Sequence, residues 1–514
     1  MLFNEINQDN SHILRLIEYK QEIDSTIIRD LIAGHERVAT RRRMLYERFK
    51  AEPNTLPIKN RQYPDSTKAR NEIAHNFPKD IIETRVGYFL GNPVAYSLDI
   101  PDVDAEELAE HPHYRALEDF NLENNAEDLD AETDRWRAVT GTAFRYYWVD
   151  PKMPAGEMTD RVTLVPSWEV ITIRHRSTDD LEAAIRYYDW EYWQDHRMHK
   201  RRRVEWIDRE TITYYIETET GKYVLDPLEE QNPYYHPYPG QVPVVEFPNN
   251  EERKGDFEDV LDKINEYDRT VSDLANELEE YRLAYLKMKG AKPDKETVQR
   301  AKQTGVWGLP SPEMDIDFIV KQINIEATKA HLERLEDDIM RLSNSINFQD
   351  KNFGGNISGI AMRYKMQGLE SKCKTAERKM TAALRRQFKV LEAGWKVSGR
   401  LDLRDFSARN VWFQFKRNYP RDYRDEAEAS ATLKGLISDE TRLSLLSFID
   451  SPEFELRKMR EEEAARLESA FGPGGLIGGE EDVIPGRGAE SGQGGGTQAG
   501  QTQQAPDHQL PPNA

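Results

Sequence analysis

The sequence contains a single cysteine, Cys373, in 514 residues. One cysteine excludes an intramolecular disulfide and any metal centre built from several thiolates. No apolar run approaches the ~18 residues that a membrane-spanning helix needs. The N-terminal segment MLFNEINQDNSHILRLIEYK also lacks the basic and then apolar order of a signal peptide. We therefore expect a soluble protein that works in a reducing compartment and has no membrane partner.

Basic residues are few relative to acidic ones. The chain has 71 Lys and Arg against 92 Asp and Glu, which gives a formal net charge of −21. Tight, sequence-indifferent DNA binding draws its free energy from cations that displace counterions from phosphate. The charge therefore argues against such binding, and any encounter with DNA is expected to be loose.

The familiar nucleotide-binding and catalytic motifs are missing. The glycine-rich stretch FGGNISG at residues 353–359 follows a helical pattern and has no Lys after its glycines. A Walker loop needs a preceding strand and a terminal G-K-[ST]. No G-x-S-x-G elbow is present, and with 92 acidic residues any choice of a catalytic carboxylate pair would be arbitrary. We expect no enzymatic activity and no cofactor.

Two pairs of histidines raise the question of a metal site. His111 and His113 lie in HPHY, and His196 and His199 lie in DHRMH beside the basic run HKRRR. Neither pair follows H-E-x-x-H, and the basic run is typical of a hairpin tip. We expect surface histidines and no bound metal. Cys373 falls on the apolar side of a predicted helix, which favours a core position over a nucleophile.

The first 254 residues combine helices with strands. Helical patterns cover residues 12–50, the start of residues 71–96 and most of residues 101–134, with a break at Gly91-Asn92-Pro93. Seven segments rich in aromatic and β-branched residues then follow, which is typical of strands. They are AFRYYWV, RVTLVPS, VITIRHR, AAIRYYDWEYW, RRRVEWI, TITYYIE and KYVLD. We predict an α+β region with an antiparallel sheet.

A different pattern begins at residue 255. From Phe257 to Tyr285 the spacing of apolar residues alternates between three and four, which is typical of a packed helix. At 1.5 Å per residue this helix would be a rod of roughly 45 Å. Its other faces carry ten acidic residues against three basic ones. A second seam of the same kind runs from Leu332 to Ile346, so we predict a helical hairpin.

Three further segments surround the second seam. Between the seams, LKMKG, GVWGLP and MDIDFIVKQI are typical of strands and PDKETVQRAKQ of a short helix. After the second seam, residues 347–357 form a glycine-rich connection that is longer than the usual ~2–8 residues between helices. We interpret it as a mobile functional loop. The helix predicted next, residues 358–393, has nine Lys or Arg against two Glu between Arg363 and Lys389.

The C-terminal part starts with a strand candidate, NVWFQFKRNYP. Helical patterns fill residues 422–470, with Ser438 and Asp439 as candidate N-caps. Residues 471–514 are rich in Gly, Gln and Pro and lack periodicity, so we predict a disordered tail.

Four segments, in order, resemble the portal proteins of tailed bacteriophages, in the siphophage-type branch. The likeness covers about residues 13–467, with Ile32 at a position where the family prefers an aromatic residue. Each segment alone is weakly specific, and their common order is strongly specific. The segments are LIAGHERV, NEIAHNFPKDIIETRVGYFLGNPV, VPVVEFPNNEERKGDFEDVLDKINEYDRTVSDLANELEEYRLAYL and GLISDETRLSLLSFIDSPEFELRKMREEE.

The resemblance implies a multidomain α+β subunit in a ring of about twelve copies. The ring would occupy one capsid vertex of the virion, after assembly in the host cytoplasm, with double-stranded DNA passing along its axis. The implied partners are terminase, head–tail adaptor proteins, and the major capsid and scaffold proteins. The implied parts are N-terminal helices and wing at 1–254, stem at 255–285 and 324–346, clip at 286–323, tunnel loop at 347–357, wing helix and strand at 358–421, crown at 422–470, and a tail at 471–514 that has no counterpart in the family.

Candidate site residues follow for the tunnel loop and the clip. In the loop, polar and pliable residues are expected to face DNA, and glycine adopts positive φ at little cost. Trp307 and Leu309 are either interface anchors, since aromatic residues are enriched at hot spots, or a small core of the clip itself. Two alternatives to a portal stay open: a coiled-coil scaffold without a channel, and a metal-dependent nuclease or NTPase. The loop candidates are Lys351, Asn352, Gly354, Gly355 and Asn356.

Overall fold

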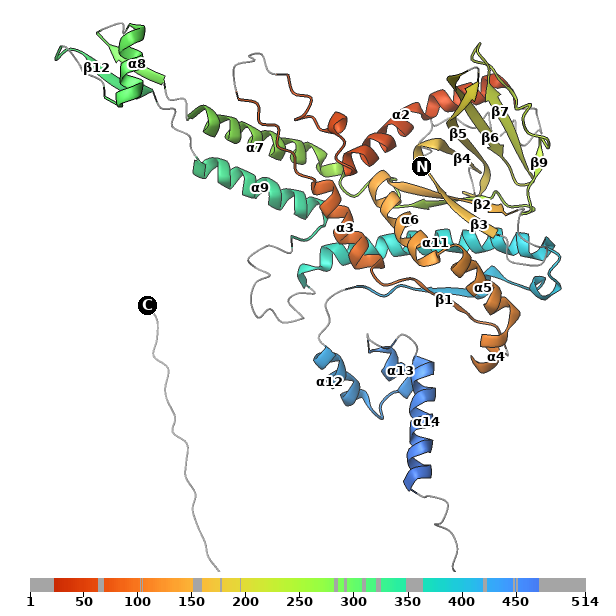
Figure 1. Ribbon diagram of the computed structural model, residues 1–514. Helices are drawn as coiled ribbons and strands as arrows, with labels where there is room; N and C mark the ends of the chain where they lie inside the picture. Colours follow the sequence, from red (N-terminus) through yellow and green to blue (C-terminus); the bar gives the residue numbers. More distant parts are fainter. Residues whose placement is uncertain are drawn as a thin grey trace, which may run out of the picture. The chain divides into compact units, whose positions relative to one another are not determined.

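The computed structural model separates into two compact units, Met1–Tyr419 and Pro420–Ala514, and each is described by itself (Figure 1). In the first unit a run of helices is followed by a run of antiparallel strands, which is typical of an α+β fold, and the second unit is helical. The described residues are 23–62, 69–101, 103, 105–150, 160–175, 178–194, 196–281, 285–290, 294–306, 311–319, 325–347, 364–418, 423–446, 449 and 452–470.

The helices of the N-terminal half agree with the predicted order. Helix α2 begins where the carboxylate of Asp24 accepts hydrogen bonds from the backbone N–H groups of Thr26 and Ile27, both at 2.9 Å. This cap satisfies two donors that have no partner inside the helix. The acidic segment is helical, as predicted. The helices are α2 (Ser25–Phe49), α3 (Phe77–Leu90), α4 (Ala105–Glu110), α5 (Pro112–Glu123) and α6 (Ala126–Thr140), with a 3-10 turn η1 (Pro53–Thr55) after α2.

All seven predicted strands form, but they belong to two antiparallel sheets instead of one. One sheet has the order β10-β2-β3, and the other has the order β4-β5-β6-β7-β8 with β9 paired to β7. The break comes at Pro166, which has no N–H to donate and precedes the 3-10 turn η2 (Ser167–Glu169). The strands are β2 (Thr142–Val149), β3 (Asp160–Val165), β4 (Val170–Arg174), β5 (Leu181–Gln194), β6 (Arg197–Ile207), β7 (Thr211–Glu217), β8 (Tyr223–Leu225), β9 (Tyr234–Tyr235) and β10 (Val244–Pro248).

The long helix α11 (Gln367–Val397) packs on β10 and on α3, and its apolar face forms much of the largest core. Phe388 and Trp395 are fully buried there, and the indole N–H of Trp395 donates to Asp160 at 3.1 Å. Next to this core, β1 (Ala95–Leu98) pairs antiparallel with β13 (Val411–Gln414), which confirms the strand expected near residue 411. Two 3-10 turns separate α11 from β13: η5 (Leu401–Leu403) and η6 (Ala408–Asn410).

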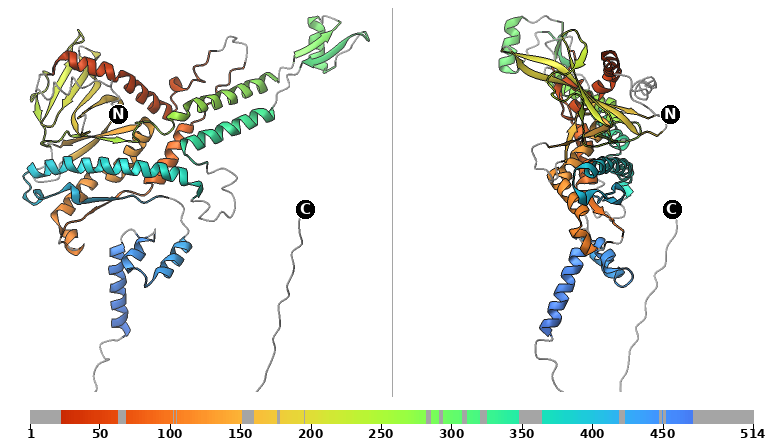
Figure 2. Two further views of the ribbon diagram at one scale, coloured as in Figure 1. Left: turned by 180° about the vertical axis from the view of Figure 1, so that it is seen from behind. Right: turned by 90° about the vertical axis from the view of Figure 1, so that its right-hand side faces the viewer.

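Helices α7 (Leu261–Tyr281) and α9 (Ile325–Ser343) lie side by side, as Figures 1 and 2 show. Helix α7 is shorter than the predicted residues 255–285, because a 3-10 turn η3 (Glu258–Val260) precedes it and Tyr285 begins a strand. Between the two helices, β11 (Tyr285–Lys289) pairs antiparallel with β12 (Asp315–Ile319), and α8 (Lys295–Thr304) connects them. In GVWGLP, the described residues Gly305 and Val306 are not in a strand.

The second unit contains α12 (Tyr423–Leu433), α13 (Asp439–Ser444) and α14 (Pro452–Ala470), and α13 contacts both of the others. Ser438 is the N-cap of α13, because its hydroxyl accepts from the N–H of Thr441 at 3.2 Å. Asp439, the other candidate, lies in the first turn. Among the helices that the structure describes, none is long and apolar enough for a membrane crossing.

Candidate functional site: the helical hairpin and its base

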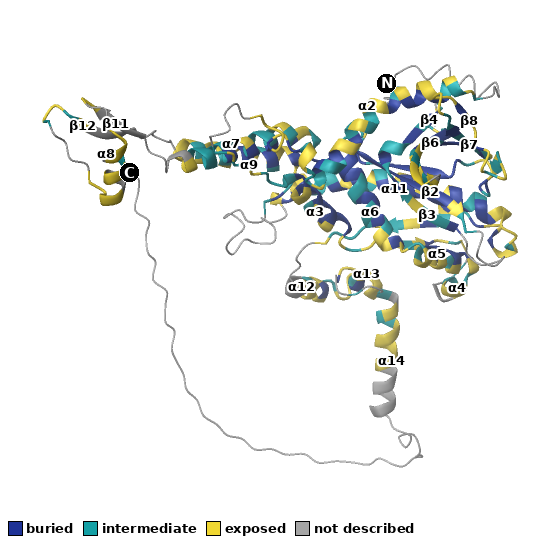
Figure 3. Cartoon of the chain, turned by 45° about the horizontal axis from the view of Figure 1, so that its top comes forward, coloured by how far each residue is buried: buried dark blue, intermediate teal, exposed yellow. Residues whose placement is uncertain are grey.

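The apolar seam of α7 is buried at the start of the hairpin and partly exposed at its far end. Phe257, Val260 and Ile264 are at most 1% exposed, whereas Leu278 is 47% exposed. On α9, Ile339 is fully buried. Figure 3 shows the same trend, with half-buried and exposed residues along both helices and buried residues where α3, α6 and β2 pack. The core of the subunit therefore covers the apolar seam of α7 at its start and leaves the seam partly exposed at its far end.

A second face of α7 binds an extended segment, residues 69–76, which we name the strap. The backbone N–H groups of alternate strap residues donate to side chains one helical turn apart on α7. Two extended residues advance about 6.6 Å and four helical residues about 6 Å, so the two spacings match. This pairing explains why α3 begins at Phe77 and not at residue 71. The three bonds are Asn71 to Asn276 at 2.6 Å, Ile73 to Ser272 at 2.9 Å and His75 to Asp268 at 2.8 Å.

The start of the hairpin meets three other helices in a buried group of charges, which we name the base cluster. Arg85 of α3 bonds to Asp134 of α6 at 2.8 Å and to Asp256 at 3.1 Å. Lys372 of α11 lies 3.2 Å from Asp256, and Arg137 lies 2.5 Å from Asp134. Each carboxylate therefore has two cations, which limits the cost of burying these charges.

The electrostatics of the base cluster keep Asp256 ionised. Burial alone would raise the pKa of Asp256, but the charges of Lys372 and Arg85 together lower that pKa below its ordinary value. The amide of Asn249 donates to the same carboxylate at 2.8 Å. A charged, fully bonded carboxylate is thus the point at which the sheet region, α3 and α11 hold the first residues of the hairpin.

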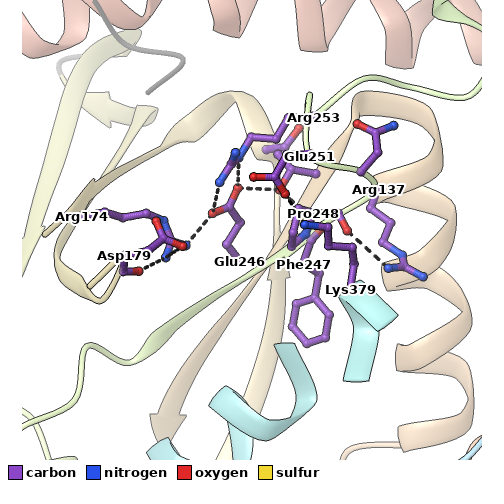
Figure 4. A network of polar contacts seen from close by, with 12 residues as sticks. Arg137, Arg174, Asp179, Glu246, Phe247, Pro248, Glu251, Arg253 and Lys379 are labelled. Carbon is purple, nitrogen blue, oxygen red and sulfur yellow. Dashed lines mark hydrogen bonds and ion pairs between the residues drawn. The ribbon is translucent and has the colours of Figure 1, made fainter. Parts of the chain in front are cut away.

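A second buried carboxylate fixes the turn that leads from β10 to the hairpin (Figure 4). Glu246 bonds to Arg174 at 2.5 Å and to Arg253 at 2.6 Å. Burial alone would raise the pKa of Glu246, but the two guanidinium charges lower it well below its ordinary value. In the same turn, Glu251 forms an ion pair with Lys379 of α11. The entry to the hairpin is therefore held by side chains as well as by backbone.

Two glycines allow the backbones of α6 and the hairpin entry to approach closely. Gly141 has φ +87, and a Cβ there would overlap the carbonyl oxygen of Arg253. A Cβ on Gly255 would overlap the carbonyl oxygen of Val139. Glycine is needed at both positions because no larger residue fits between the two backbone segments. At Gly141 the positive φ also disfavours other residues.

A polar cavity of about 580 Å³ lies where α9 ends and α11 begins. Asn344, at φ +53, ends α9 in the left-handed region that asparagine tolerates. The ammonium group of Lys372 donates to the carbonyl of Ser343 at 2.8 Å. The end of α9 and the start of α11 are therefore held near one site. The lining residues are Asn249, Asn250, Asp256, Asn344, Gln367, Gly368, Ser371, Lys372 and Thr375.

The predicted site residues lie outside the part of the chain that the structure describes. For the loop, the described residues stop at Asn347 and resume at Tyr364; for the clip, they stop at Val306 and resume at Ser311. Their roles stay predictions. These residues are Lys351, Asn352, Gly354, Gly355 and Asn356 of the loop, and Trp307 and Leu309 of the clip.

The expectation of surface histidines is wrong for His113. His113 is only 8% exposed, and its Nε2 lies 3.1 Å from the carbonyl oxygen of Asp402. It shares the buried face of α5 with Ala116, Leu117 and Phe120, a helical spacing that could have revealed it. His196 is exposed, in the turn between β5 and β6.

The structure also tests the predictions for the basic run after His199 and for Cys373. The basic run after His199 lies within β6 and not at the tip of the hairpin. Cys373 is fully buried, and burial raises the pKa of its thiol to about 12. The core position of Cys373 is confirmed. Within the described ranges, no three His, Cys, Asp or Glu side chains are placed to hold a metal ion.

Sequence reasoning did not find the base cluster or the strap. Asp134 and Arg137 have the i,i+3 spacing of a helical ion pair, which was an available signal. Nothing in the sequence marks Arg85 as their partner, because it lies 49 residues from Asp134. The strap carries no periodic pattern of its own, since three of its bonds to α7 use backbone N–H donors, which every residue except proline has.

Comparison with known proteins gives consistent matches along most of the chain. A family described as phage portal protein, SPP1 Gp6-like, matches residues 28–469. The chain is similar to the portal protein of Bacillus phage SPP1, with 25% identity over 469 residues that cover 87% of this chain and 88% of that protein. It is also similar to the portal protein of Clostridium phage phiCD119, with 25% identity over 344 residues, 61% of this chain and 69% of that protein.

Proposed function

This chain belongs to the SPP1 Gp6-like family of phage portal proteins, and on that premise we propose that its copies close into a ring of about twelve subunits. The ring occupies one vertex of the capsid and forms the channel for genome packaging and ejection. In this proposal the α7–α9 hairpin is the stem, residues 286–323 the clip, the sheet region the wing and residues 422–470 the crown. The role is structural and not catalytic.

The exposed far end of the hairpin is the observation that carries the ring. Leu278 near the end of α7 is 47% exposed and Ile325 at the start of α9 is 54% exposed. Exposed apolar surface at a helical interface favours contact with another copy, and a head-to-tail contact whose rotation closes gives a ring. Double-stranded DNA, terminase, head–tail adaptor proteins and the capsid and scaffold proteins are the proposed partners.

Particle shape tests the proposal directly. We expect the purified chain to form closed rings in electron micrographs and a single large species in analytical ultracentrifugation. Only monomers or dimers across salt and protein concentration would contradict the ring. Rods without a channel would favour the scaffold alternative, and magnesium-dependent hydrolysis of DNA or ATP would favour the enzymatic one.

The loop at residues 347–357 is proposed to contact the passing DNA. Lys351 gives one positive charge per subunit, and single exposed charges bind weakly and are screened by salt. Replacing Gly354 and Gly355 by Val stiffens the loop, so rings should form while packaging is slow or packaged DNA is poorly retained. Lys351→Glu should affect DNA retention and not assembly. Unchanged packaging and retention in both variants would contradict this role.

The clip is proposed to bind terminase and then the adaptor proteins. Trp307, with Leu309 beside it, is the proposed anchor, because aromatic side chains dominate interface energies. Trp307→Ala should leave rings intact and weaken packaging or adaptor binding. Unchanged infectivity with intact rings would reject the anchor, and misfolding of the clip would assign Trp307 to its core.

A further inference from the structure

Helix α11 is basic in an acidic protein. It has eight Lys or Arg against three Glu, whereas the whole chain has a net charge of −21. Four of these cations are exposed and lie on one side of the helix: Lys374, Arg378, Arg385 and Lys389. Their spacing is four, seven and four residues, which at about 100° per residue keeps all four within a sector of about 60°. We name them the basic stripe.

The subunit itself leaves most of the basic stripe uncompensated. In the described part of the chain, no ion pair joins Arg378, Arg385 or Lys389 to a carboxylate, although Arg378 donates to the hydroxyl of Thr375 at 3.2 Å. Lys374 lies 4.0 Å from Glu370.

The other two acidic residues of α11 have partners of their own. Glu377 pairs with Arg417, and Glu392 pairs with Lys396. The basic stripe therefore presents net positive charge to the solvent.

Helix α7 carries acidic residues with the same spacing. Asp262, Glu266, Asp273 and Glu277 are again four, seven and four residues apart, and we name them the acidic stripe. At about 100° per residue they occupy a sector separate from both the apolar seam and the face bound by the strap. The first and last residues of each stripe are fifteen positions apart, or about 22 Å along the helix.

Three residues of the acidic stripe form ion pairs near the surface with cations of their own chain. Asp273 lies 2.5 Å from Arg61, Glu266 lies 3.1 Å from Arg269, and Asp262 lies 3.4 Å from Lys263. The side chains of Asp262, Glu266 and Asp273 are between 43% and 77% exposed. Exposed pairs of this kind are weak and exchange readily, so the stripe remains able to bind an outside cation.

We propose that the basic stripe on α11 of one copy docks on the acidic stripe on α7 of the next copy. This inference rests on the proposed ring and names one contact that builds it. The four-seven-four spacing reads the same in both directions, so parallel and antiparallel alignment both place Arg378 and Arg385 opposite Glu266 and Asp273. Two unlike surfaces on one subunit give a head-to-tail contact, as a ring requires.

The matched spacing favours a second copy over nucleic acid as the occupant. A phosphate backbone offers charges about every 3.4 Å along each strand and would accept cations at many spacings. DNA would also leave the equal spacing on α7 without a role, and the net charge of −21 opposes its approach.

Charge reversal on each helix tests the contact. One variant carries Arg378→Glu and Arg385→Glu, and the other carries Glu266→Lys and Asp273→Lys. Each places like charges at the interface, so we expect the concentration for half-assembly to rise about tenfold or more in either one alone. Mixed one to one, the two variants restore opposite charges at every contact and should assemble in alternation. A chain with all four substitutions should also assemble.

The control has the same change in charge as the α11 variant, at another exposed place. Arg29→Glu with Arg37→Glu on α2 should assemble like the unmodified chain, and circular dichroism checks that every variant is folded. Normal assembly of either reversed variant, or a mixture that fails to assemble, would overturn the contact. So would a reversed α11 variant that assembles but loses binding to a short DNA duplex.

The ring and the contact can fail separately. If the unmodified chain never forms rings, the proposed function fails, yet the two reversed variants should still form a mixed complex that neither forms alone. If the unmodified chain forms rings and both reversed variants do too, only the stripe contact is wrong.

Discussion

The apolar residues at the two ends of α7 have the same three-and-four spacing but lie in different environments. At the start, Ile264 packs in a core with residues of α2, α3 and α6. At the far end, Leu278 continues the same seam and is 47% exposed. Regular spacing therefore identifies which face of a helix is apolar, and the surrounding fold decides how much of that face is covered.

The ionic contacts of the hairpin differ in the same way. In the base cluster, Arg85 is 1% exposed and joins two carboxylates that are also buried. Farther along α7, Asp273 pairs with Arg61 with both side chains more than a third exposed. Because the base cluster is buried, its ion pairs are costly to break. Because the pair on α7 is exposed, it can exchange partners readily.

The largest effect is expected from removing the buried guanidinium. Arg85→Ala leaves Asp134 and Asp256 short of a cation in a buried site, which should lower the free energy of unfolding by about 3–5 kcal/mol. Chemical denaturation measures it. Arg135→Ala is the matched control, because that partly exposed arginine of α6 pairs with Glu83 and Glu132 and should cost less than about 1 kcal/mol. Equal losses would contradict the comparison.

A smaller effect is expected from shortening apolar side chains of the α7 seam, and it should differ between the two ends of the helix. Ile264→Ala should lower the free energy of unfolding by about 2–5 kcal/mol, because the site is fully packed. Leu278→Ala should lower it by less than about 1 kcal/mol, since half of that side chain already contacts water. The measurement uses protein dilute enough to remain unassembled. A large loss at Leu278 under those conditions would mean that its own subunit covers it.

Mild acid should weaken the contribution of His35 on α2 to stability and leave that of the base cluster unchanged. His35 is 1% exposed and bonds to Tyr187 at 2.8 Å, and burial followed by the charge of Arg42 lowers its pKa to about 3. Between the unfolded value of 6.5 and about 3, the unfolded chain binds the extra proton. Stability therefore falls as pH drops through this window, by about 2 kcal/mol from pH 6.5 to 5.

A histidine replacement separates the two acid effects. His35→Gln should reduce the slope between pH 6.5 and 5, as measured by thermal unfolding at several pH values. The slope that remains belongs to His113 and His236, because burial lowers the pKa of each. The lowered pKa of Asp256 makes the base cluster lose stability only at more acidic pH, below its ordinary value of 3.8. An unchanged slope in His35→Gln would assign the effect to another group.

The smallest effect is expected in the strap. Ser272→Ala removes the acceptor for the N–H of Ile73, which should cost about 1 kcal/mol. Hydrogen exchange at Ile73 should become faster, while exchange in α3 stays the same. Thr270→Ala, on a face of α7 outside the strap bonds, is the control. Equal exchange at Ile73 in both variants would mean that the strap is held by other contacts.

Sequence patterns predicted the elements well and their assembly poorly. The seven strands and the long helices follow from local periodicity, and Ser438 follows from capping chemistry. The division into two sheets falls at Pro166 and the 3-10 turn η2, between two strands whose local patterns are alike. The base cluster depended on contacts between distant segments, such as Arg85 with Asp256, which no local pattern records.

The candidate site could be predicted only in part. The family and the hairpin followed from ordered motifs and the apolar seam, while the burial gradient along α7 depended on the packing of α2, α3 and α6. Residues such as Lys351 and Trp307 were chosen for charge, flexibility and size alone, and they remain predictions.

The strap gives the hairpin a directional mechanical response. Its three backbone N–H bonds to α7 follow one another along the helix axis, at Asp268, Ser272 and Asn276. Force along that axis loads the three bonds together, so they share the shear. Force across the axis peels the strap and loads one bond after another. The hairpin should therefore resist pushing along its length far better than bending to the side.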